Sequence, residues 1–401
     1  MKDIVTDTVI SEKETHIKEI DDSFVAHTYA RFPVEIVRGK GSIVVDKNGK
    51  EYVDMGSGIG VTAFGIADET WKNAVWEQLC KVQHASNLYY TAPCAILAEK
   101  LCRKTGMKKV FFGNSGAEAN ECAIKAARKY AQDKKRSEYN VIITLKNSFH
   151  GRTITTLAAT GQDVFHDKFL PLTGGFVYAE ANNFASVEKL VKENAVAGIM
   201  IECVQGEGGV IPLEKAFVQS VAALCKKEDV VLIIDEVQTG NGRTGKLYSY
   251  MHFGIEPDVV TTAKGLGGGL PIGACLLGEK VENVFSYGDH GSTFGGNPVA
   301  CAGANSIIDR LTDEFLLEAE KKSNYVFKTL TGAKGIKSVS GMGLMIGVET
   351  EKPAKEVVNK CLEKGVLFLT AKTKVRLLPA LNIPFETLEK AISVLKEVCG
   401  E

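Results

Sequence analysis

The sequence predicts an α/β protein in which a large, doubly wound, mainly parallel sheet lies beside a smaller α+β unit. From about residue 95, short apolar runs rich in β-branched residues alternate with helical stretches. Unbroken apolar runs are typical of strands buried on both faces, and their alternation with helices indicates a parallel sheet covered on both sides. The length of 401 residues exceeds the roughly 100–200 residues of one ordinary domain, so we expect a second packed unit.

The individual elements follow from local patterns in chain order. After a polar arm to about residue 30, PVEIVRG and SIVVD alternate in polarity, and Asn48 and Gly49 lead into EYVDM, which predicts an antiparallel hairpin. In the large unit, strands are expected at KKVFF, VIITL, AGIMIE, VVLIID and DVVTTA. Helices are expected between them, at AEANECAIKAARKYA and FVQSVAALCKK. A helix-rich stretch follows Asn297, and the smaller unit is expected at GMGLMIGVE, a helix near 353–364, VRLLPALNI and ETLEKAISVLKEV.

Composition and charge exclude several classes of function. The 48 Lys and Arg residues balance 49 Asp and Glu, a net charge of -1, which leaves no basic excess for nucleic acid or an anionic membrane. No apolar stretch approaches the roughly 18 residues of a membrane span, and the polar start lacks a signal-peptide core, so we expect a cytoplasmic protein. The 10 cysteines form no CxxC pair and the histidines form no HExxH, so no metal site is predicted.

Two glycine-rich patterns in TGNGRTGKL are similar to nucleotide-binding loops, and both are rejected. Gly240, Gly242 and Gly245 satisfy GxGxxG, but the pattern does not leave its strand directly and no clear helix follows. Gly240, Gly245 and Lys246 approach a P-loop, but Leu247 stands where a Ser or Thr would hold magnesium. We therefore expect no nucleotide site here.

Another pattern places ionisable residues at the ends of strands. Asp235 ends VVLIID, and Lys264 follows DVVTTA and precedes a glycine-rich loop. Ligand sites in open α/β sheets gather at these carboxyl ends. A lysine there can form a Schiff base with an aldehyde cofactor, and an acid placed against a pyridine nitrogen keeps that nitrogen protonated. Each residue alone also fits a commoner role, Lys264 as a solvated turn residue and Asp235 as a cap or ion-pair partner.

The start of the helix after KKVFF is suited to bind phosphate. Ser115, Gly116 and Ala117 begin this helix, where free backbone amides and the positive end of the helix dipole attract anions. The spacing of Ser115 and Glu118 is also that of a capping box, which starts a helix without any ligand. The two roles are compatible.

Six strings carry a resemblance to a known family: GNSGAEANE, FHGRT, IECVQGEGG, IIDEVQTGNGRTGK, TAKGLGGGLPIGA and DHGSTFGGNP. Within a match over about residues 29–398, they resemble the subgroup III, or ornithine-type, aminotransferases, which use pyridoxal 5'-phosphate (PLP). The resemblance implies the fold-type I architecture, with a large PLP-binding domain over residues 61–300. Residues 1–60, an N-terminal arm and hairpin, and residues 301–401 would form the small domain, and two chains would form a homodimer with shared active sites.

The resemblance also implies roles for individual residues. The catalytic set is Lys264, which bonds the PLP aldehyde, Asp235, which faces the pyridine nitrogen, and the switch residue Glu207. The cofactor-binding set is Ser115, Gly116, Ala117, Phe149, Asp235, Val237, Gln238, Lys264 and, from the partner subunit, Thr293. The substrate-binding set is Arg152 for the α-carboxylate, Glu202, the switch pair Glu207 and Arg376, Ser292, and Ile59. Outside their motifs, Phe149 would fit core packing, Thr293 a turn, and Arg376 a solvated charge or a structural ion pair.

Four further strings narrow the expected substrate: HTYARFPVEIVRG, HASNLYYTAPCAILAEKL, VRLLPALNI and SGMGLMIGVE most resemble acetylornithine aminotransferases of arginine synthesis. The implied reaction moves the δ-amino group of N2-acetylornithine to 2-oxoglutarate. Ile59, where ornithine enzymes tend to carry a tyrosine, favours a donor without a free α-ammonium. Alternatives are 4-aminobutyrate, ornithine or succinyldiaminopimelate as donor, a PLP aminomutase or decarboxylase, and an inactive binding protein. The chain departs from the family at GIADET, where a GHxHP turn is common, and this affects a local loop rather than the chemistry.

Overall fold

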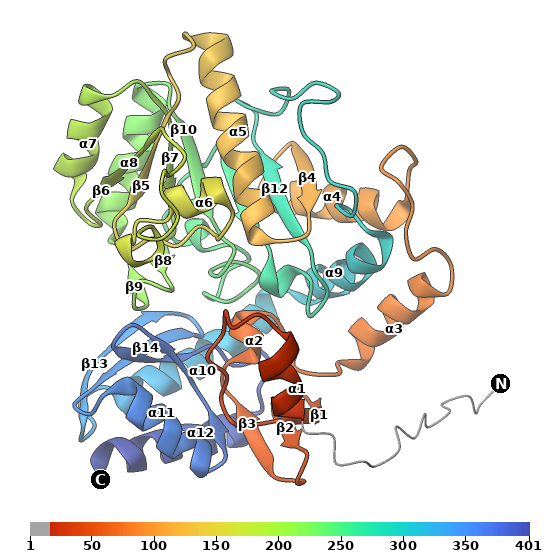
Figure 1. Ribbon diagram of the computed structural model, residues 1–401, viewed down its shortest axis with the longest axis vertical. Coiled ribbons are helices and arrows are strands. Elements are labelled where there is room, and N and C mark those ends of the chain that lie inside the picture. Colours follow the sequence, from red (N-terminus) through yellow and green to blue (C-terminus); the bar gives the residue numbers. More distant parts are fainter. Residues whose placement is uncertain (1–16) are drawn as a thin grey trace.

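The computed structural model describes residues 17–401, which form a large and a small unit, drawn at the top and bottom of Figure 1. The main strands of the large unit are β4 (Lys109–Gly113), β5 (Val141–Leu145), β6 (Phe176–Ala179), β7 (Val196–Ile201), β10 (Val231–Asp235), β11 (Val259–Thr262) and β12 (Gly273–Leu277). They form one sheet in the order β4-β12-β11-β10-β7-β5-β6. Strand β12 runs antiparallel to both neighbours, and the other adjacent strands pair in parallel. The predicted mainly parallel sheet is confirmed.

Helices cover both faces of this sheet because its strands bury side chains on alternate sides. The helices of the large unit are α3 (Glu69–Leu79), α4 (Ala92–Thr105), α5 (Gly116–Lys134), α6 (Ile154–Ala159), α7 (Phe184–Glu193), α8 (Lys215–Lys227) and α9 (Pro298–Arg310). Along β10, Val231 and Ile233 pack in a core that includes α5, while Leu232 and Ile234 pack in a core that includes α4, α8 and α9. The doubly wound arrangement is thereby confirmed.

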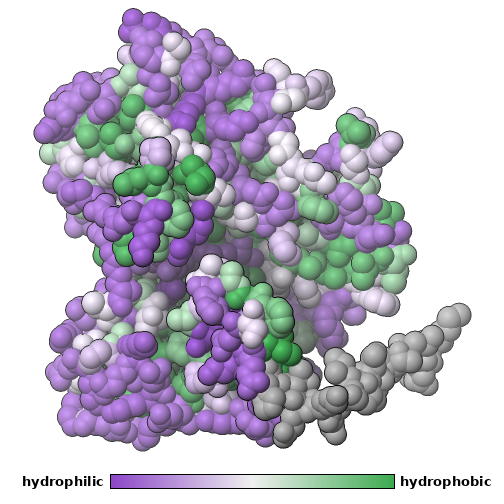
Figure 2. All heavy atoms as spheres, in the orientation of Figure 1, coloured by the Kyte–Doolittle hydropathy of each residue, from purple (hydrophilic) through white to green (hydrophobic). Residues whose placement is uncertain are grey.

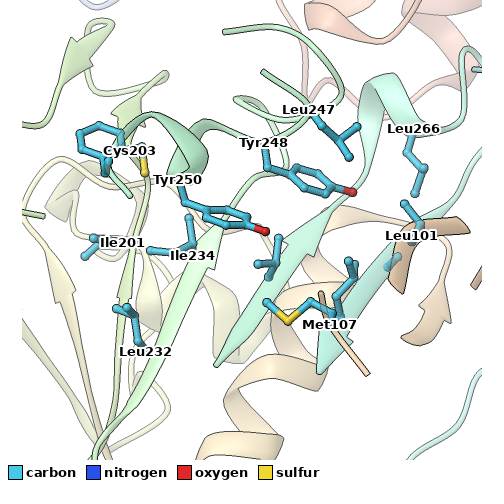
Figure 3. Close-up of a cluster of buried hydrophobic side chains, with 14 of the residues drawn as sticks. Leu101, Met107, Ile201, Cys203, Leu232, Ile234, Leu247, Tyr248, Tyr250 and Leu266 are labelled. Atoms are coloured by element: carbon cyan, nitrogen blue, oxygen red, sulfur yellow. The ribbon is translucent and has the colours of Figure 1, made fainter. Parts of the chain in front are cut away.

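Figure 3 shows part of the core beneath α4, α8 and α9, where Tyr248 and Tyr250 lie near Leu232, Ile234 and Met107. The two tyrosine rings stack with their centroids 6.2 Å apart. Shorter elements complete the large unit: the 3-10 helices η1 (Asp163–Phe165), η2 (Ser249–His252) and η3 (Lys264–Leu266), and the paired strands β8 (Val204–Gln205) and β9 (Ile211–Pro212). Within residues 17–401, no helix combines the length and apolarity needed to cross a bilayer.

The small unit is built from both ends of the described chain. Its N-terminal part contributes α1 (Ile17–Phe24), β1 (Ile36–Lys40), β2 (Ile43–Asp46), β3 (Glu51–Asp54) and α2 (Ser57–Gly60). Its C-terminal part contributes α10 (Asp313–Leu330), β13 (Ile336–Met342), β14 (Met345–Thr350), α11 (Ala354–Glu363), β15 (Val366–Leu367), β16 (Leu369–Ala371), β17 (Lys374–Leu377) and α12 (Phe385–Gly400). Strands β1, β2 and β3 pair antiparallel, which confirms the predicted hairpin, and β15 joins β3 in parallel. The other four strands form a second sheet in the order β13-β14-β17-β16.

Helix α10 links the cores of the two units. Leu316 and Ala319 near its start are buried in the large core, whereas Val326 and Leu330 near its end are buried in the small core. Helix α9 before it packs against α3 and α4. The expected boundary at residue 300 falls within the first turn of α9, whereas the change from one core to the other occurs within α10.

The glycine-rich segment TGNGRTGKL lies at the junction of the two units. Arg243, which is buried, donates from Nη1 to the carbonyl oxygens of Pro379 at 2.6 Å and Leu344 at 3.2 Å. Gly242 has φ +87°, and a Cβ there would lie 2.9 Å from Leu316. The glycine is required by both its backbone conformation and its close packing. This segment holds the small unit against the large one.

Candidate active site

A cavity of about 430 Å³ lies where the loops after β4, β5, β7, β10 and β11 converge. These loops all leave the carboxyl ends of their strands, which is where open α/β sheets bind ligands. Figure 2 shows that the surface is hollowed between the two units. The cavity brings together ten of the expected site residues: Ser115, Gly116, Ala117, Phe149, Arg152, Glu202, Asp235, Val237, Gln238 and Lys264.

Lys264 begins η3, just after β11, in a strained backbone conformation. Its φ of +47° lies in the left-handed region, which a non-glycine residue occupies at a cost that the surrounding structure must offset. Burial lowers the pKa of Lys264, and the carboxylates of Glu207 and Asp235 oppose that shift. A lowered pKa leaves more of the amine unprotonated, which is the form that attacks an aldehyde or accepts a proton.

The carboxylate of Asp235 is held by three groups at the end of β10. Oδ1 accepts a hydrogen bond from the Val237 amide at 3.0 Å. Oδ2 accepts one from Asn120 Nδ2 at 2.8 Å and lies 2.8 Å from Nδ1 of His150. Burial alone would lower the pKa of His150, but the hydrogen bond and charge of Asp235 raise it. A protonated His150 would stabilise the negative charge that Asp235 needs in order to face a protonated ring nitrogen.

Asn120 and His150 join the candidate site through their contacts with Asp235, although no sequence pattern singles them out. Asn120 lies one turn into α5, and its Nδ2 also donates to the carbonyl oxygen of His150 at 2.7 Å. Both residues lie within strings that carry the family resemblance, Asn120 in GNSGAEANE and His150 in FHGRT. Their task depends on a contact between two strings that lie far apart in the sequence, which the strings themselves do not reveal.

The start of α5 combines a cap with free amides. Ser115 is the N-cap, and its Oγ accepts a hydrogen bond from the Glu118 amide at 3.2 Å, which confirms the predicted cap. The first-turn amides of Gly116 and Ala117 have no partner within the helix, as in any helix start. A Cβ at Gly116 would lie only 2.5 Å from Cγ1 of Val237, so glycine allows the helix start and the loop after β10 to meet.

The residues in this cavity fit PLP. Lys264 offers an amine for the aldehyde, Asp235 a carboxylate for the pyridine nitrogen, and the start of α5 an anion site for the phosphate. Phe149 and Val237 line the cavity from two different loops, and they are expected to cover the two faces of the ring.

Glu202 follows β7 and forms part of the cavity wall. Its side chain is buried, and Oε2 accepts a hydrogen bond from the Phe149 amide at 3.0 Å. Burial raises the pKa of Glu202 to about 8, with His150 opposing the shift and Asp235 adding to it. At neutral pH this carboxyl group therefore carries a proton and can donate a hydrogen bond toward a bound molecule.

Glu207 and Arg376 form the expected pair beside the cavity. Arg376 Nη1 donates to Glu207 Oε1 at 2.5 Å and to Gln238 Oε1 at 3.2 Å, and Gln238 Nε2 donates to Glu207 Oε1 at 3.2 Å. Burial alone would raise the pKa of Glu207, but the charge and hydrogen bond of Arg376 hold it below its usual value. The Arg376 side chain is 4% exposed and that of Glu207 29%, so the glutamate is the partner with room to move.

Arg152 lies at the edge of the cavity and is exposed. Its guanidinium makes no hydrogen bond or ion pair with any residue in the range 17–401. A planar guanidinium with its donors free is suited to grip a carboxylate through two parallel hydrogen bonds. The geometry thus leaves Arg152 available for its expected role, which remains a prediction.

The remaining expected residues lie outside the cavity lining. Ile59 has φ +64° and lines a separate, mainly apolar cavity of about 360 Å³ with residues such as Phe32 and Leu369. Ser292 Oγ accepts a hydrogen bond from Asn114 Nδ2 at 3.2 Å, next to the start of α5, and Thr293 is exposed. The contributions of Ile59 and Ser292 to substrate binding, and of Thr293 to the partner subunit, remain predictions.

The protein family and the relatives that this chain matches are aminotransferases. A family model described as aminotransferase class-III matches residues 24–399. The chain is 51% identical over 387 residues to the acetylornithine aminotransferase of Haemophilus ducreyi, which covers 96% of this chain and 98% of that protein.

Two solved structures agree with this family match. The N-acetylornithine aminotransferase of Stenotrophomonas maltophilia superposes with a TM-score of 0.82 and 34% identity, covering 95% of this chain and 97% of that one. An ornithine aminotransferase of Toxoplasma gondii, described with partial occupancy of PLP at its active site, superposes with a TM-score of 0.91 and 31% identity, covering 98% and 95%.

Proposed function

Because the chain belongs to the class-III aminotransferase family, we propose that it transfers the δ-amino group of N2-acetylornithine to 2-oxoglutarate. The products would be N-acetylglutamate 5-semialdehyde and glutamate, which is a step of arginine synthesis, and we expect the protein to act in the cytoplasm. The chain is a PLP-dependent aminotransferase. The choice of donor is supported by the name and the 51% identity of the Haemophilus ducreyi relative.

The reaction type rests on one observation, the convergence of Lys264, Asp235 and the start of α5 on a single cavity. When bound there, PLP supplies an aldehyde that takes up the amino group and a ring that withdraws electrons from the reacting carbon. Lys264 would hold the aldehyde and then, once released, move the proton that the reaction transfers. Asp235, held by His150 and Asn120, would keep the ring nitrogen protonated.

Two arginines would sort the substrates by their carboxylates. Arg152 would grip the α-carboxylate of the donor at the edge of the cavity. Arg376 would be covered by Glu207 while acetylornithine reacts, and it would be released when glutamate or 2-oxoglutarate brings a second carboxylate. The 2.5 Å contact between Arg376 and Glu207 supports the covered state, and the greater exposure of Glu207 supports its movement.

We also infer that the working unit is a two-fold dimer with shared sites. Large apolar side chains are exposed on α3 and on the loop before α4, among them Trp76, Leu88 and Tyr90, and Figure 2 shows apolar surface in the region of α3 and α9. Tyr287 and Phe294, which flank the segment that carries Thr293, are exposed as well. A two-fold interface over these elements would bury them and would carry Thr293 to the phosphate site of the other chain.

The proposed donor predicts a specificity ratio. Acetylornithine is expected to exceed both ornithine and 4-aminobutyrate in kcat/KM by at least about tenfold, or ~1.4 kcal/mol. The free α-ammonium of ornithine would lose its hydration beside Val61, whose apolar side chain lines the cavity and offers no acceptor, whereas the acetamide carries no charge. Ile59, which the resemblance assigns to the same contact, lies outside the cavity lining. The measurement is a panel of donors, including succinyldiaminopimelate, with 2-oxoglutarate as acceptor and glutamate as the detected product.

The donor panel and the visible absorbance of the purified protein together separate the alternative functions. A better rate with 4-aminobutyrate would remove the assignment to arginine synthesis and leave the aminotransferase. A purified protein whose visible absorbance changes with a donor, yet which forms no glutamate, would indicate a PLP aminomutase or decarboxylase. A protein without such absorbance would indicate an inactive binding protein.

The switch pair predicts a second change in specificity. Glu207→Ala is expected to raise kcat/KM for glutamate relative to acetylornithine by about tenfold, because Arg376 stays uncovered and attracts a second carboxylate in both half-reactions. Single-turnover rates with each donor measure this ratio. Glu207→Gln, which keeps the shape without the charge, should lie between wild type and alanine. Equal ratios in all three proteins would contradict the switch.

A further inference from the structure

The Arg152 guanidinium rests on two aromatic rings. Its central carbon lies 4.3 Å from the ring centroid of Phe165 and 5.5 Å from that of Phe149. The two rings meet edge to face, with their centroids 5.7 Å apart and an interplanar angle of 73°. Phe149 lines the cavity, whereas Phe165 belongs to η1 and is not part of the cavity lining. Phe165 is thus the nearer of the two rings to Arg152 and lies behind the cavity wall.

This contact fixes the guanidinium without using its hydrogen-bond donors. A cation above an aromatic face is attracted by the electrons of the ring, and the N–H groups at the edge of the guanidinium remain free. No carboxylate or carbonyl group among residues 17–401 competes for those donors. An exposed arginine has several rotatable bonds, so a free guanidinium would have to be ordered by each incoming ligand.

The backbone around Phe165 is tied to the strand that leads to Arg152. Gly161 approaches so closely that a Cβ there would lie 2.1 Å from the carbonyl oxygen of Leu145, the last residue of β5. Gln162 Nε2 donates to the carbonyl oxygen of Ser148 at 3.0 Å, and the Phe165 amide donates to the carbonyl oxygen of Gln162 at 3.0 Å. The Phe165 ring is thus held in position relative to the loop that carries Phe149 and Arg152.

We propose that Phe165 is a positioning residue that holds the Arg152 guanidinium ready to receive the α-carboxylate of the donor. The proposal rests on the proposed function of Arg152 in binding that carboxylate. Phe165 contacts neither substrate nor reacting atoms, so its removal should weaken carboxylate binding and leave the chemical step nearly unchanged. Arg152 would then sample many side-chain conformations before each binding event.

The test measures binding and turnover separately in the PLP-loaded protein. N-acetylnorvaline, which is acetylornithine without the reactive amine, is titrated by calorimetry, and KM and kcat are measured with acetylornithine. Phe165→Leu is expected to raise both the Kd of the analogue and the KM of acetylornithine about tenfold, with kcat changed less than about twofold. Phe165→Tyr keeps the ring and should restore both values to within about twofold of wild type.

Two further proteins make the outcome specific. Phe169→Leu makes the same change at an exposed phenylalanine four residues further along the chain. The Phe169 ring makes no aromatic or cation contact within residues 17–401, so this variant should keep the wild-type Kd and KM. Arg152→Ala with Phe165→Leu should bind the analogue no more weakly than Arg152→Ala alone, because the ring acts through the arginine.

The results that overturn the proposal differ from those that overturn the function. An unchanged Kd of the analogue in Phe165→Leu would overturn the proposal. An unchanged KM together with a lower kcat and a shifted cofactor absorbance would overturn it too, because the substitution would then act through Phe149 and not through Arg152. Additive losses in the double variant would overturn it as well. If Arg152→Ala itself binds the analogue as tightly as wild type, the proposed function of Arg152 fails first, and with it the basis for Phe165.

Discussion

Lys264→Ala is expected to lower transamination by at least about a thousandfold, the largest effect of any single substitution in this chain. One amine would serve both to hold the cofactor aldehyde and to move a proton, and within residues 17–401 no other lysine lines the cavity. The phosphate site expected at the start of α5 does not include Lys264, so PLP should still bind without its covalent link. The loss would appear in kcat with acetylornithine and equally with every other donor.

Borohydride reduction followed by peptide mapping checks the assignment directly. In wild type, the cofactor should be trapped on the peptide that contains Lys264, and in Lys264→Ala no peptide should carry it. Lys246→Ala is the matched control, because this exposed lysine belongs to the glycine-rich segment that was rejected as a nucleotide site. A label on any other lysine of wild type would refute the role of Lys264.

The same variant tests whether sites are shared between chains. Lys264→Ala and Thr293→Ala chains would each be deficient alone, but a mixed dimer would hold one site with both residues intact. Random mixing should then restore about a quarter of wild-type activity, well above the sum of the separate proteins. If no activity returns after the chains exchange, or if sedimentation finds a fully active monomer, Thr293 does not serve a partner.

Arg152→Ala is expected to lower kcat/KM for acetylornithine by about a hundredfold, or ~3 kcal/mol, because two charge-assisted hydrogen bonds to the α-carboxylate are lost. The loss with 4-aminobutyrate should be smaller, since its carboxylate lies on a different carbon relative to the reacting amine. Steady-state rates with both donors give the two ratios.

Arg152→Lys is the matched control for charge. Lysine keeps the positive charge but lacks the planar fork, so it should recover only part of the loss. Equal losses with both donors in Arg152→Ala would contradict a specific α-carboxylate contact and would favour a general effect on the cavity.

Short sequence strings were sufficient to place the main features of the site. Asp235 and Lys264 stand at the ends of apolar strands, and a parallel sheet brings such ends to one edge whatever the loops between them do. The Ser115 side chain caps α5 as predicted, because an N-cap is a local structure, but Glu118 accepts from the Asn114 amide and not from that of Ser115, so the reciprocal half of the capping box is not formed. For the same reason the hairpin near Asn48 was predictable from alternation and a turn signal.

Contacts between distant strings could not be predicted in this way. Gln238 was expected to bind the cofactor, and its side-chain amide also bonds both Glu207 and Arg376 across the junction of the two units, which its motif does not reveal. Phe165 comes from a segment without any catalytic motif, and its position under Arg152 depends on how closely Gly161 approaches β5. The expected boundary at residue 300 falls inside α9, whose buried residues belong to the core of the large unit. A helix can pack on either of two neighbouring cores, and its own pattern does not say which.

The parallel pairing of β15 with β3 sets the order in which this chain can complete its fold during synthesis. Val53 pairs with Val366, so on the order of 300 residues must be made between the two strands. At the roughly 5–20 residues per second of translation, the ribosome needs about 15–60 s to cover that distance. During this time β3 has an open edge that can pair with other chains, and every strand of the large sheet, from β4 to β12, is made before β15. The strands that leave the ribosome first are thus the last to be sealed, and a nascent chain needs protection at its beginning until its end has been made.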